Sequence, residues 1–261
     1  MKQTPIQPDL TTIPSRFHSL LEGTAVYDSS CSEAARVYFL DRDGGLFLKS
    51  APGGTLESEA QMTAYFHTLG LGAEVLAYTS CDRDWMLTRA VPGEDCTDER
   101  YLADPKRLSE QMAGLLWQLH HREAEDCPVK AHSDGYLALA RHNYETGAYR
   151  RDLFPDNWGY DSAEEAIAVI REMGHLLKND TLIHGDYCLP NVMMKNWRFT
   201  GFIDVGNGGL GDKHVDLFWG SWSMGFNTGD PRWGQRFLDA YGRENYDPEI
   251  LRLIAACEVF G

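Results

Sequence analysis

Oxygen-bearing side chains suited to phosphoryl transfer gather in one stretch of this chain, HGDYCLPN at residues 184–191. Asp186 and Asn191 stand five residues apart, and a second carboxylate, Asp204, follows thirteen residues after Asn191. A carboxylate can orient an attacking hydroxyl and accept its proton, while an amide oxygen and a second carboxylate can hold Mg²⁺ against nucleotide phosphates. The spacing therefore predicts a phosphoryl-transfer site.

The competing interpretation is a chance turn at residues 184–186, with Asn191 and Asp204 acting only as helix caps. Apolar residues flank both parts of the motif: Leu182, Ile183, Val192, Met193, Phe202 and Ile203. Such flanks are typical of buried strands that hold the loops between them still. The whole pattern favours the catalytic interpretation.

The elements that would position these residues differ between the two parts of the chain. In the first part we expect a hairpin over 36–50 around Asp43-Gly44-Gly45, a helix over 56–70, and strands over 74–80 and 85–91. A break follows at Pro92-Gly93. These patterns predict a β-rich N-terminal lobe over residues 1–91, joined by a connector at 92–96.

From Asp104 onward the pattern is helical. Asp104-Pro105 is typical of a helix start, with an N-cap before proline, and apolar residues then recur along one face of that helix. We expect further helices near 133–147, 162–178, 212–226, 231–241 and 247–260, and short strands within 181–206. Residues 97–261 are therefore predicted to form a mainly α-helical lobe, with the ligand in a cleft between the lobes.

Composition narrows the class of protein. The chain has 261 residues, 43% hydrophobic and 24% charged, and no apolar run of the roughly 18 residues that a membrane helix needs. Its N-terminal residues lack the apolar stretch of a secretory signal, and its six cysteines form no paired ligand spacing. We expect a cytoplasmic protein with reduced thiols, without a membrane anchor, zinc site or disulfide framework.

The formal net charge is −15, from 24 Lys and Arg against 39 Asp and Glu. Such a field repels nucleic-acid backbones and anionic membranes and attracts a polycation. The alternative interpretation of this charge is that it only keeps the protein soluble. Together with the predicted phosphoryl-transfer site, the charge leads us to expect a nucleotide and a polycationic small molecule as partners, with no nucleic acid or membrane. The protein itself is expected to be a monomer or a weak dimer.

The H-G-D-x-x-x-x-N loop followed by F-I-D resembles the aminoglycoside phosphotransferases, a branch of the protein-kinase-like fold. HGDYCLPNVM, RFTGFIDVG, GDKHVD and the C-terminal EVF are similar to aminoglycoside 3'-phosphotransferases, and SCSEAARVY, LFLKS and MLTRAVPG match that family's N-terminal lobe. The resemblance covers nearly the whole chain. It implies a two-lobed α+β fold and transfer of the γ-phosphate of ATP or GTP to a hydroxyl of an aminoglycoside antibiotic, the 3'-hydroxyl, conferring resistance.

The resemblance also implies roles for residues of the motif. Asp186 would be the catalytic base, and Asn191 and Asp204 would be the Mg²⁺ ligands. His184 and Asp216 would brace the catalytic loop by hydrogen bonding.

On the nucleotide side, Lys49 ends the strand LFLK as the nucleotide lysine of kinase-like proteins does, and it needs a carboxylate partner. Glu59 is the expected partner, with Glu57 as the rival, since two residues apart on a helix they face different ways. Phe47 shares a strand face with Lys49 and resembles the aromatic that stacks on adenine; the alternative is an ordinary core residue of the N-terminal lobe.

Two further segments are assigned to the nucleotide by resemblance. The backbone of Thr88, Arg89 and Ala90 would meet the adenine. Ser30 and Ser32 lie in the loop between the first two strands, where hydroxyl or amide groups could cradle phosphates, although the chain has no glycine-rich loop there.

For the acceptor, Asp156 and Glu258 are the acidic candidates. The chain departs from the family at four places: Gly159, Asn207, Cys257 and Gly261. These departures thin the acidic site and leave open one alternative, a kinase of the same fold acting on another hydroxylated metabolite. A further alternative is a catalytically silent nucleotide-binding module, against which the intact base and both metal ligands argue.

Other features are interpreted as structural. Phe218, Trp219, Trp222 and Phe226 recur at helical spacing and are predicted to be core rather than a substrate wall. His120 and His121 end a predicted helix, where capping or solvation accounts for them.

Overall fold

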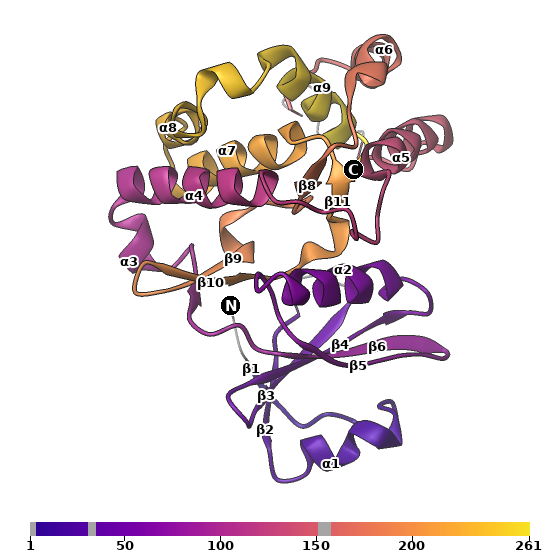
Figure 1. The fold of residues 1–261 in the computed structure, drawn as a ribbon. Coiled ribbons are helices and arrows are strands. Elements are labelled where there is room, and N and C mark those ends of the chain that lie inside the picture. Colours follow the sequence, from indigo (N-terminus) through magenta and orange to yellow (C-terminus); the bar gives the residue numbers. More distant parts are fainter. Residues whose placement is uncertain (1–3, 31–34, 151–157) are drawn as a thin grey trace. The chain divides into compact units, whose positions relative to one another are not determined.

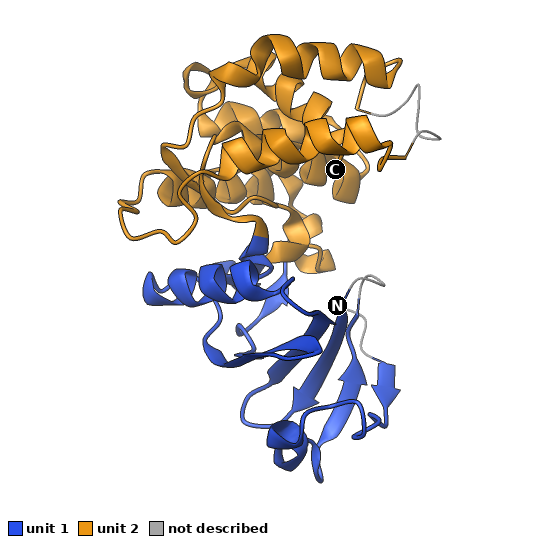
Figure 2. Ribbon diagram, turned by 90° about the vertical axis from the view of Figure 1, so that its right-hand side faces the viewer, with its two compact units in different colours: residues 1–95, 192–206 blue, residues 96–191, 207–261 orange. Residues whose placement is uncertain are grey.

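The computed structural model describes residues 4–30, 35–150 and 158–261 (Figure 1). Two expected site residues, Ser32 and Asp156, lie outside the described residues. The chain forms two compact units (Figure 2): unit 1 comprises Met1–Asp95 and Val192–Gly206, and unit 2 comprises Cys96–Asn191 and Asn207–Gly261.

Unit 1 is built on an antiparallel sheet with strand order β1-β2-β3-β4-β6-β5. The strands are β1 (Thr4–Ile6), β2 (Ala25–Asp28), β3 (Arg36–Asp41), β4 (Leu46–Pro52), β5 (Val75–Ser80) and β6 (Arg83–Arg89). The expected hairpin is present: β3 and β4 pair from Arg36↔Ser50 to Leu40↔Leu46. Its turn places Asp43, Gly44 and Gly45 at positive φ, as the turn chemistry predicts.

Each face of this sheet carries its own apolar cluster, because neighbouring residues of a strand point to opposite faces. Trp85 and Leu87 of β6 pack with Phe17, which ends the short turn η1 (Ser15–Phe17) before α1 (His18–Leu21). Met86, between them, packs instead with Ala60 of α2 (Glu57–Thr68). The sheet of unit 1 therefore has a helix over each face.

Unit 1 also contains residues 192–206, which differs from the expected assignment of this segment to the C-terminal lobe. The reason is strand pairing. β9 (Val192–Lys195) lies between β10 (Arg198–Phe202) and β7 (Glu94–Asp95), which forms inside the expected connector. Phe202 also bridges to Gly72, so the end of β10 is fixed beside the end of α2.

Unit 2 is mainly helical. Its helices are α3 (Glu99–Leu102), α4 (Pro105–His120), α5 (His132–Thr146), α6 (Ala163–Met173), α7 (His214–Thr228), α8 (Arg232–Tyr241) and α9 (Pro248–Glu258). One two-stranded sheet joins β8 (Thr181–Ile183) to β11 (Gly209–Gly211). The expected start of α4 is confirmed, since the Asp104 carboxylate accepts the Arg107 N–H at 3.1 Å, with Pro105 as the first helical residue.

One core cluster of unit 2 lies between α5, α6 and α9, where Ile167, Ile170, Leu253 and Phe260 are almost completely buried. Across residues 4–30, 35–150 and 158–261, no helix is long and apolar enough to span a bilayer.

Candidate active site

The HGDYCLPN segment forms a loop of unit 2 between β8 and the turn η4 (Leu189–Asn191). The chain reverses at Gly185, whose φ is +83°. A Cβ at this position would lie 1.8 Å from the carbonyl oxygen of Asn207, so only glycine fits. The loop therefore passes unusually close to the backbone that follows residue 206.

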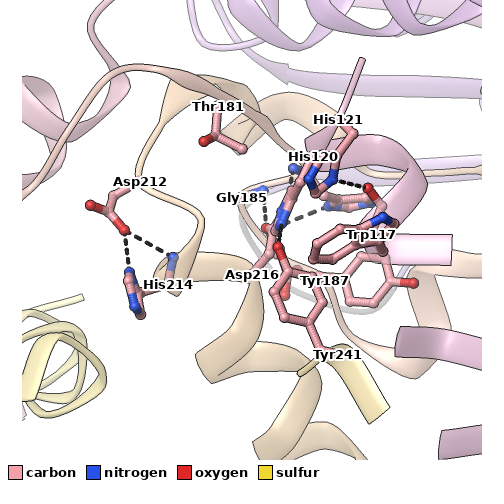
Figure 3. Close-up of polar contacts among 12 residues, drawn as sticks. Trp117, His120, His121, Thr181, Gly185, Tyr187, Asp212, His214, Asp216 and Tyr241 are labelled. Carbon is pink, nitrogen blue, oxygen red and sulfur yellow. Dashed lines mark hydrogen bonds and ion pairs between the residues drawn. The ribbon is translucent and has the colours of Figure 1, made fainter. Parts of the chain in front are cut away.

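Asp216 of α7 holds this loop from below (Figure 3). Its two carboxylate oxygens accept the backbone N–H groups of His184 and Gly185, each at 2.8 Å, and the residue is completely buried. His184 is also completely buried, and its Nδ1 accepts the N–H of Asp186 at 3.3 Å. Both residues thus make the bracing hydrogen bonds that their expected role requires.

His120 completes the brace, and the sequence-based interpretation of this residue as a helix cap or solvated group was wrong. Its ring is buried, with Nε2 3.1 Å from an Asp216 carboxylate oxygen and Nδ1 2.8 Å from the hydroxyl of Tyr241 (Figure 3). Since a carboxylate only accepts, Nε2 carries the proton, Nδ1 accepts, and Tyr241 donates. Burial lowers the pKa of His120, which favours the neutral ring that this pattern needs.

One signal for His120 was available in the sequence. The residue follows Met112 and Leu116 at intervals of four on the buried face of α4, so solvation was not the natural interpretation. His121, on the exposed side, agrees with the expectation; its ring stacks on that of Trp117 at 3.8 Å.

Two further bonds tie the loop to neighbouring helices. The hydroxyl of Tyr187 donates to the carbonyl oxygen of Met112 in α4 at 2.8 Å, and the N–H of Leu189 donates to Oγ of Ser223 in α7 at 2.9 Å. The backbone around Asp186 is therefore held from α4 and α7 together.

Asp186 and Asn191 are brought together by this loop. The side-chain nitrogen of Asn191 donates to both the carboxylate and the carbonyl oxygen of Asp186, each at 2.9 Å. Asp186 remains half-buried and Asn191 is buried. One carboxylate oxygen of Asp186 is thus fixed by Asn191, and the amide oxygen of Asn191 is left as a hard ligand atom.

Unit 1 contains the ion pair expected on the nucleotide side. Lys49 Nζ lies 2.7 and 2.8 Å from the two carboxylate oxygens of Glu59, and 3.6 Å from Asp204. Burial opposes the lysine charge, but Glu59 and Asp204 outweigh it and raise the pKa of Lys49. Glu57 is exposed and accepts from Gln61. The helix thus presents Glu59, and not Glu57, to the lysine.

Asp204 has the left-handed backbone conformation, with φ of 54°, which is uncommon outside glycine. Its side chain is 59% exposed. Strained residues of this kind cluster at functional sites, where the surrounding structure fixes them. The chain therefore presents a carboxylate beside Lys49 that is accessible to a ligand.

The described part of the chain has no cluster of three or more His, Cys, Asp and Glu side chains that could enclose a metal. Mg²⁺ does not require one, because it usually takes one or two protein ligands, with substrate phosphates and water completing its shell. Unit 1 offers a carboxylate at Asp204, and unit 2 offers an amide oxygen at Asn191; each is a hard oxygen donor.

Two other residues expected to contact the nucleotide, Phe47 and Ser30, differ in how far their side chains are already engaged within the protein. Phe47 is half-buried on the same strand face as Lys49, with its ring 5.1 Å from that of Phe39. Ser30 already accepts the N–H of Val37 through its hydroxyl at 2.9 Å. Part of its hydrogen-bonding capacity is therefore used to shape its own loop.

The backbone segment expected to meet adenine, residues 88–90, already uses some of its N–H groups in hydrogen bonds within the protein. Thr88 is buried in β6, the N–H of Arg89 donates to Glu74, and that of Ala90 donates to Gly45, both at 2.9 Å. Two of the three amides thus have partners within unit 1. Contact with a base would fall to carbonyl oxygens, or would need those bonds to open.

Glu258, the expected acceptor residue, ends α9 in a largely apolar setting. One carboxylate oxygen accepts the hydroxyl of Tyr136 at 2.6 Å and the indole N–H of Trp219 at 3.2 Å. Burial, together with the charge of Asp186, outweighs these two bonds and raises the pKa of Glu258 to about 7. The carboxyl group therefore lies within electrostatic reach of Asp186.

The four departures from the family pattern, Gly159, Asn207, Cys257 and Gly261, lie in different surroundings. Cys257 is almost completely buried in the core, so this departure changes packing. Asn207 lies against Gly185, Gly159 adopts φ of +82°, and Gly261 lies beside the Glu258 carboxylate.

The expectation that the aromatic residues of α7 are core is wrong for two of them. Trp222 is 39% exposed and Phe226 is 69% exposed. Phe218 and Trp219 are half-buried. Helical spacing identified one helix face correctly, but it could not tell whether that face is covered.

Comparison with known proteins identifies related chains. A family described as "Phosphotransferase enzyme family" matches residues 28–254. A protein of Lactococcus lactis subsp. lactis (strain IL1403), named "Probable aminoglycoside 3'-phosphotransferase", is 43% identical over 254 residues, which is 97% of each chain. The streptomycin 3''-kinase of Streptomyces griseus is 29% identical, over 85% of this chain and 87% of its own.

Among solved structures, the crystal structure of an aminoglycoside-3'-phosphotransferase of type VIII has a TM-score of 0.78 with 23% identity, and covers 95% of this chain and 100% of its own. An aminoglycoside phosphotransferase of Streptomyces rimosus, solved in complex with ADP and streptomycin, has a TM-score of 0.72 with 24% identity, over 98% and 100% of the two chains. At these identities the likeness concerns the fold. It confirms the expected α+β class with a β-rich N-terminal part and a helical C-terminal part.

Proposed function

Because the chain belongs to this phosphotransferase enzyme family, we propose that it transfers the γ-phosphate of ATP or GTP to the 3'-hydroxyl group of an aminoglycoside antibiotic. Phosphorylation of the drug would confer resistance. The observation that carries the proposal is the pair of Asp186 and Asn191 in a loop braced by buried Asp216. The choice of acceptor is supported by the relative that shares 43% identity over nearly the whole chain.

In this proposal Asp186 is the catalytic base. Asn191 holds one of its carboxylate oxygens, so the other is available to orient the acceptor hydroxyl and take its proton. A bond forms between that hydroxyl oxygen and the γ-phosphorus, the bond from the γ-phosphorus to the bridging oxygen breaks, and the nucleoside diphosphate leaves. Most of the rate enhancement then comes from positioning and electrostatics, as in other phosphoryl transfers.

Lys49 neutralises charge on the α- and β-phosphates in this proposal, and Glu59 keeps the ammonium group in place. Asp204 and Asn191 would hold Mg²⁺, which would neutralise negative charge on the nucleotide phosphates when bound. Phe47 would stack on the adenine, and the backbone of Thr88 and Ala90 would meet its edge.

The proposal of a polycationic acceptor is supported by the negative charge of the protein. A polyamine acceptor is cationic near neutral pH, and Glu258 together with Asp186 offers carboxylates on unit 2, within a chain of net charge −15. We further propose action in the cytoplasm as a monomer or weak dimer. Nucleoside triphosphates are found there, and reducing conditions suit the five described cysteines, all of which are free.

A panel of acceptors tests the proposal. The protein is incubated with ATP or GTP, Mg²⁺ and either aminoglycosides or simpler amino alcohols and sugars; nucleoside diphosphate release is followed, and fragment masses locate the phosphate. The proposal predicts turnover on aminoglycosides with the phosphate at the 3'-position. Turnover only on simpler hydroxylated compounds would assign the other kinase function, and nucleotide binding without any turnover would identify a silent binding module.

A further inference from the structure

Four aromatic rings of unit 2 form a continuous row, here called the aromatic ladder: Trp158, Trp219, Trp222 and Phe226. Trp219, Trp222 and Phe226 follow each other at intervals of three and four along α7, so they share one stripe of the helix. Trp219 and Trp222 lie 5.5 Å apart edge to face, and Trp222 stacks on Phe226 at 4.9 Å with 14° between the ring planes.

Trp158 is the one ring of the ladder that does not come from α7, since it precedes α6 in the chain. Its ring contacts Trp219 at 5.6 Å, Trp222 at 5.7 Å and Phe218 at 5.2 Å, all edge to face. Its backbone has φ of 56°, a strained value for a bulky residue. Contacts with three rings hold Trp158 in a conformation that it would not adopt alone.

The inner rings of the ladder, Trp158 and Trp219, pack against buried core residues. Its outer rings, Trp222 and Phe226, are exposed at 39% and 69%. An ordered row of exposed aromatic rings leaves apolar surface in water, which is unfavourable unless something covers it. Trp222 and Phe226 thus form an exposed end of the ladder. At its other end, the indole N–H of Trp219 donates to Glu258 at 3.2 Å.

We propose that the aromatic ladder binds an amino-sugar ring of the acceptor, on the side away from the ring that is phosphorylated. This inference rests on the proposed function. Amino sugars combine apolar C–H faces with ammonium groups, and aromatic faces attract both. The Trp219 end of the ladder contacts Glu258, and the carboxylates of Glu258 and Asp186 are close enough to interact electrostatically. The negative charge of these two carboxylates is complementary to an ammonium group. From Trp219 to Phe226 the helix rises about 10 Å, enough to extend beyond a single sugar ring.

The ladder would therefore select acceptors by the number of their rings. A two-ring acceptor reaches Asp186 and Glu258 and gains little from Trp222 and Phe226. A three-ring acceptor gains an additional aromatic contact. Removing Trp222 should therefore weaken binding of the larger acceptor more than that of the smaller one.

The test compares kanamycin B, which has three rings, with neamine, its two-ring portion. Trp222→Ala should raise the KM for kanamycin B by about 5- to 30-fold, leave kcat and the nucleotide KM within about twofold, and change the KM for neamine by less than about twofold. Phe226→Ala should act in the same direction more weakly, and Trp222→Phe should retain most of the affinity. Leu139→Ala, which removes another exposed apolar side chain (53% exposed) on α5, is the matched control and should change nothing.

The same proteins are titrated calorimetrically with kanamycin B and sized in solution. If the native enzyme turns over both acceptors but Trp222→Ala has native KM values for both, the inference fails and the proposed function stands. An equal loss for both acceptors, or a change of oligomeric state without a change of KM, would also overturn it. If the native protein turns over neither, the proposed function fails, and the titration alone decides whether the ladder binds the amino sugar.

Discussion

At the residue scale, one buried carboxylate organises the loop that carries Asp186. Asp216 accepts from His184, Gly185 and His120, while Tyr241 completes the pattern by donating to the imidazole. Every proton in this network has one consistent position, because Asp216 can only accept. Such fully satisfied buried networks fix one arrangement of a backbone, here that of the loop carrying Asp186.

The role of the His120 ring predicts different outcomes for two similar substitutions. The amide nitrogen of Gln can reach the position of Nε2, whereas that of Asn is nearer to Nδ1. His120→Asn should therefore leave Asp216 short of a donor and lower the free energy of unfolding by about 1–3 kcal/mol. Its kcat should fall while the nucleotide KM stays constant.

His120→Gln should recover a substantial part of both losses. Chemical denaturation measures the free energy of unfolding, and steady-state kinetics measure the two parameters. Equal behaviour of the two variants would show that His120 contributes bulk rather than a hydrogen bond to Asp216.

Glu258 predicts a dependence on pH. Burial and the charge of Asp186 raise the pKa of Glu258 to about 7 in the folded protein. The folded protein then binds this proton more tightly than the unfolded chain does, so ionisation lowers stability as pH rises toward 7. Acceptor binding has the opposite trend, since only the carboxylate attracts an ammonium group.

The affinity for a permanently cationic acceptor analogue, such as a quaternised amine, should rise about tenfold between pH 6 and pH 8, as expected for one group titrating at about 7. Titration calorimetry across this range measures it. Glu258→Gln should bind more weakly and lose the pH step. A step of unchanged size in that variant would assign the titration to another group.

At the scale of elements, local signals predicted most helices and strands. Asp104-Pro105 marked the start of α4, and Asp43-Gly44-Gly45 marked the turn between β3 and β4. The grouping of residues 192–206 with unit 1 could not be predicted, because it depends on pairing of Met194 with Glu94, a hundred positions apart. Periodicity identifies a strand but does not identify its partner.

The close approach of the loop at residues 184–191 to Asn207 predicts that alanine at two glycines has unequal effects on stability. Both Gly185 and Gly229 have positive φ, but a Cβ at Gly185 would collide with the Asn207 carbonyl, whereas Gly229 has open space. Gly229→Ala should cost about 1–2 kcal/mol of stability through backbone strain alone. Gly185→Ala should cost at least twice as much and abolish turnover.

Thermal and chemical denaturation measure the two costs. Similar destabilisation by both substitutions would contradict the close approach of the loop to residue 207.

At the scale of the whole molecule, net charge sets the response to salt. A chain of net charge −15 attracts a polycationic acceptor and repels an anionic nucleotide. Raising the ionic strength from about 0.05 to 0.5 M should raise the acceptor KM by about threefold to tenfold, while the nucleotide KM should stay constant or fall. Steady-state kinetics at fixed Mg²⁺ test this, and a rise of both KM values together would contradict it.

The candidate site was predictable where chemistry is encoded by spacing. Spacing along the chain predicted that Asp186 and Asn191 act together, and it predicted Glu59 as the partner of Lys49; both pairs are in contact. It did not predict the contact of His120 with Asp216, which joins residues 96 positions apart. Nor could it show that Trp222 is exposed, because burial depends on which elements pack over a helix face.

The central claim is that Asp186 accepts the proton of the acceptor hydroxyl, and Asp186→Asn tests it most directly. This substitution preserves an oxygen for Asn191 but removes the base, so kcat should fall by about 10²- to 10⁴-fold, while the calorimetric affinity for the Mg-nucleotide changes by less than about threefold. Asp180→Asn, the same change at an exposed position, should keep native kcat. A kcat for Asp186→Asn within about threefold of the native value would contradict the account.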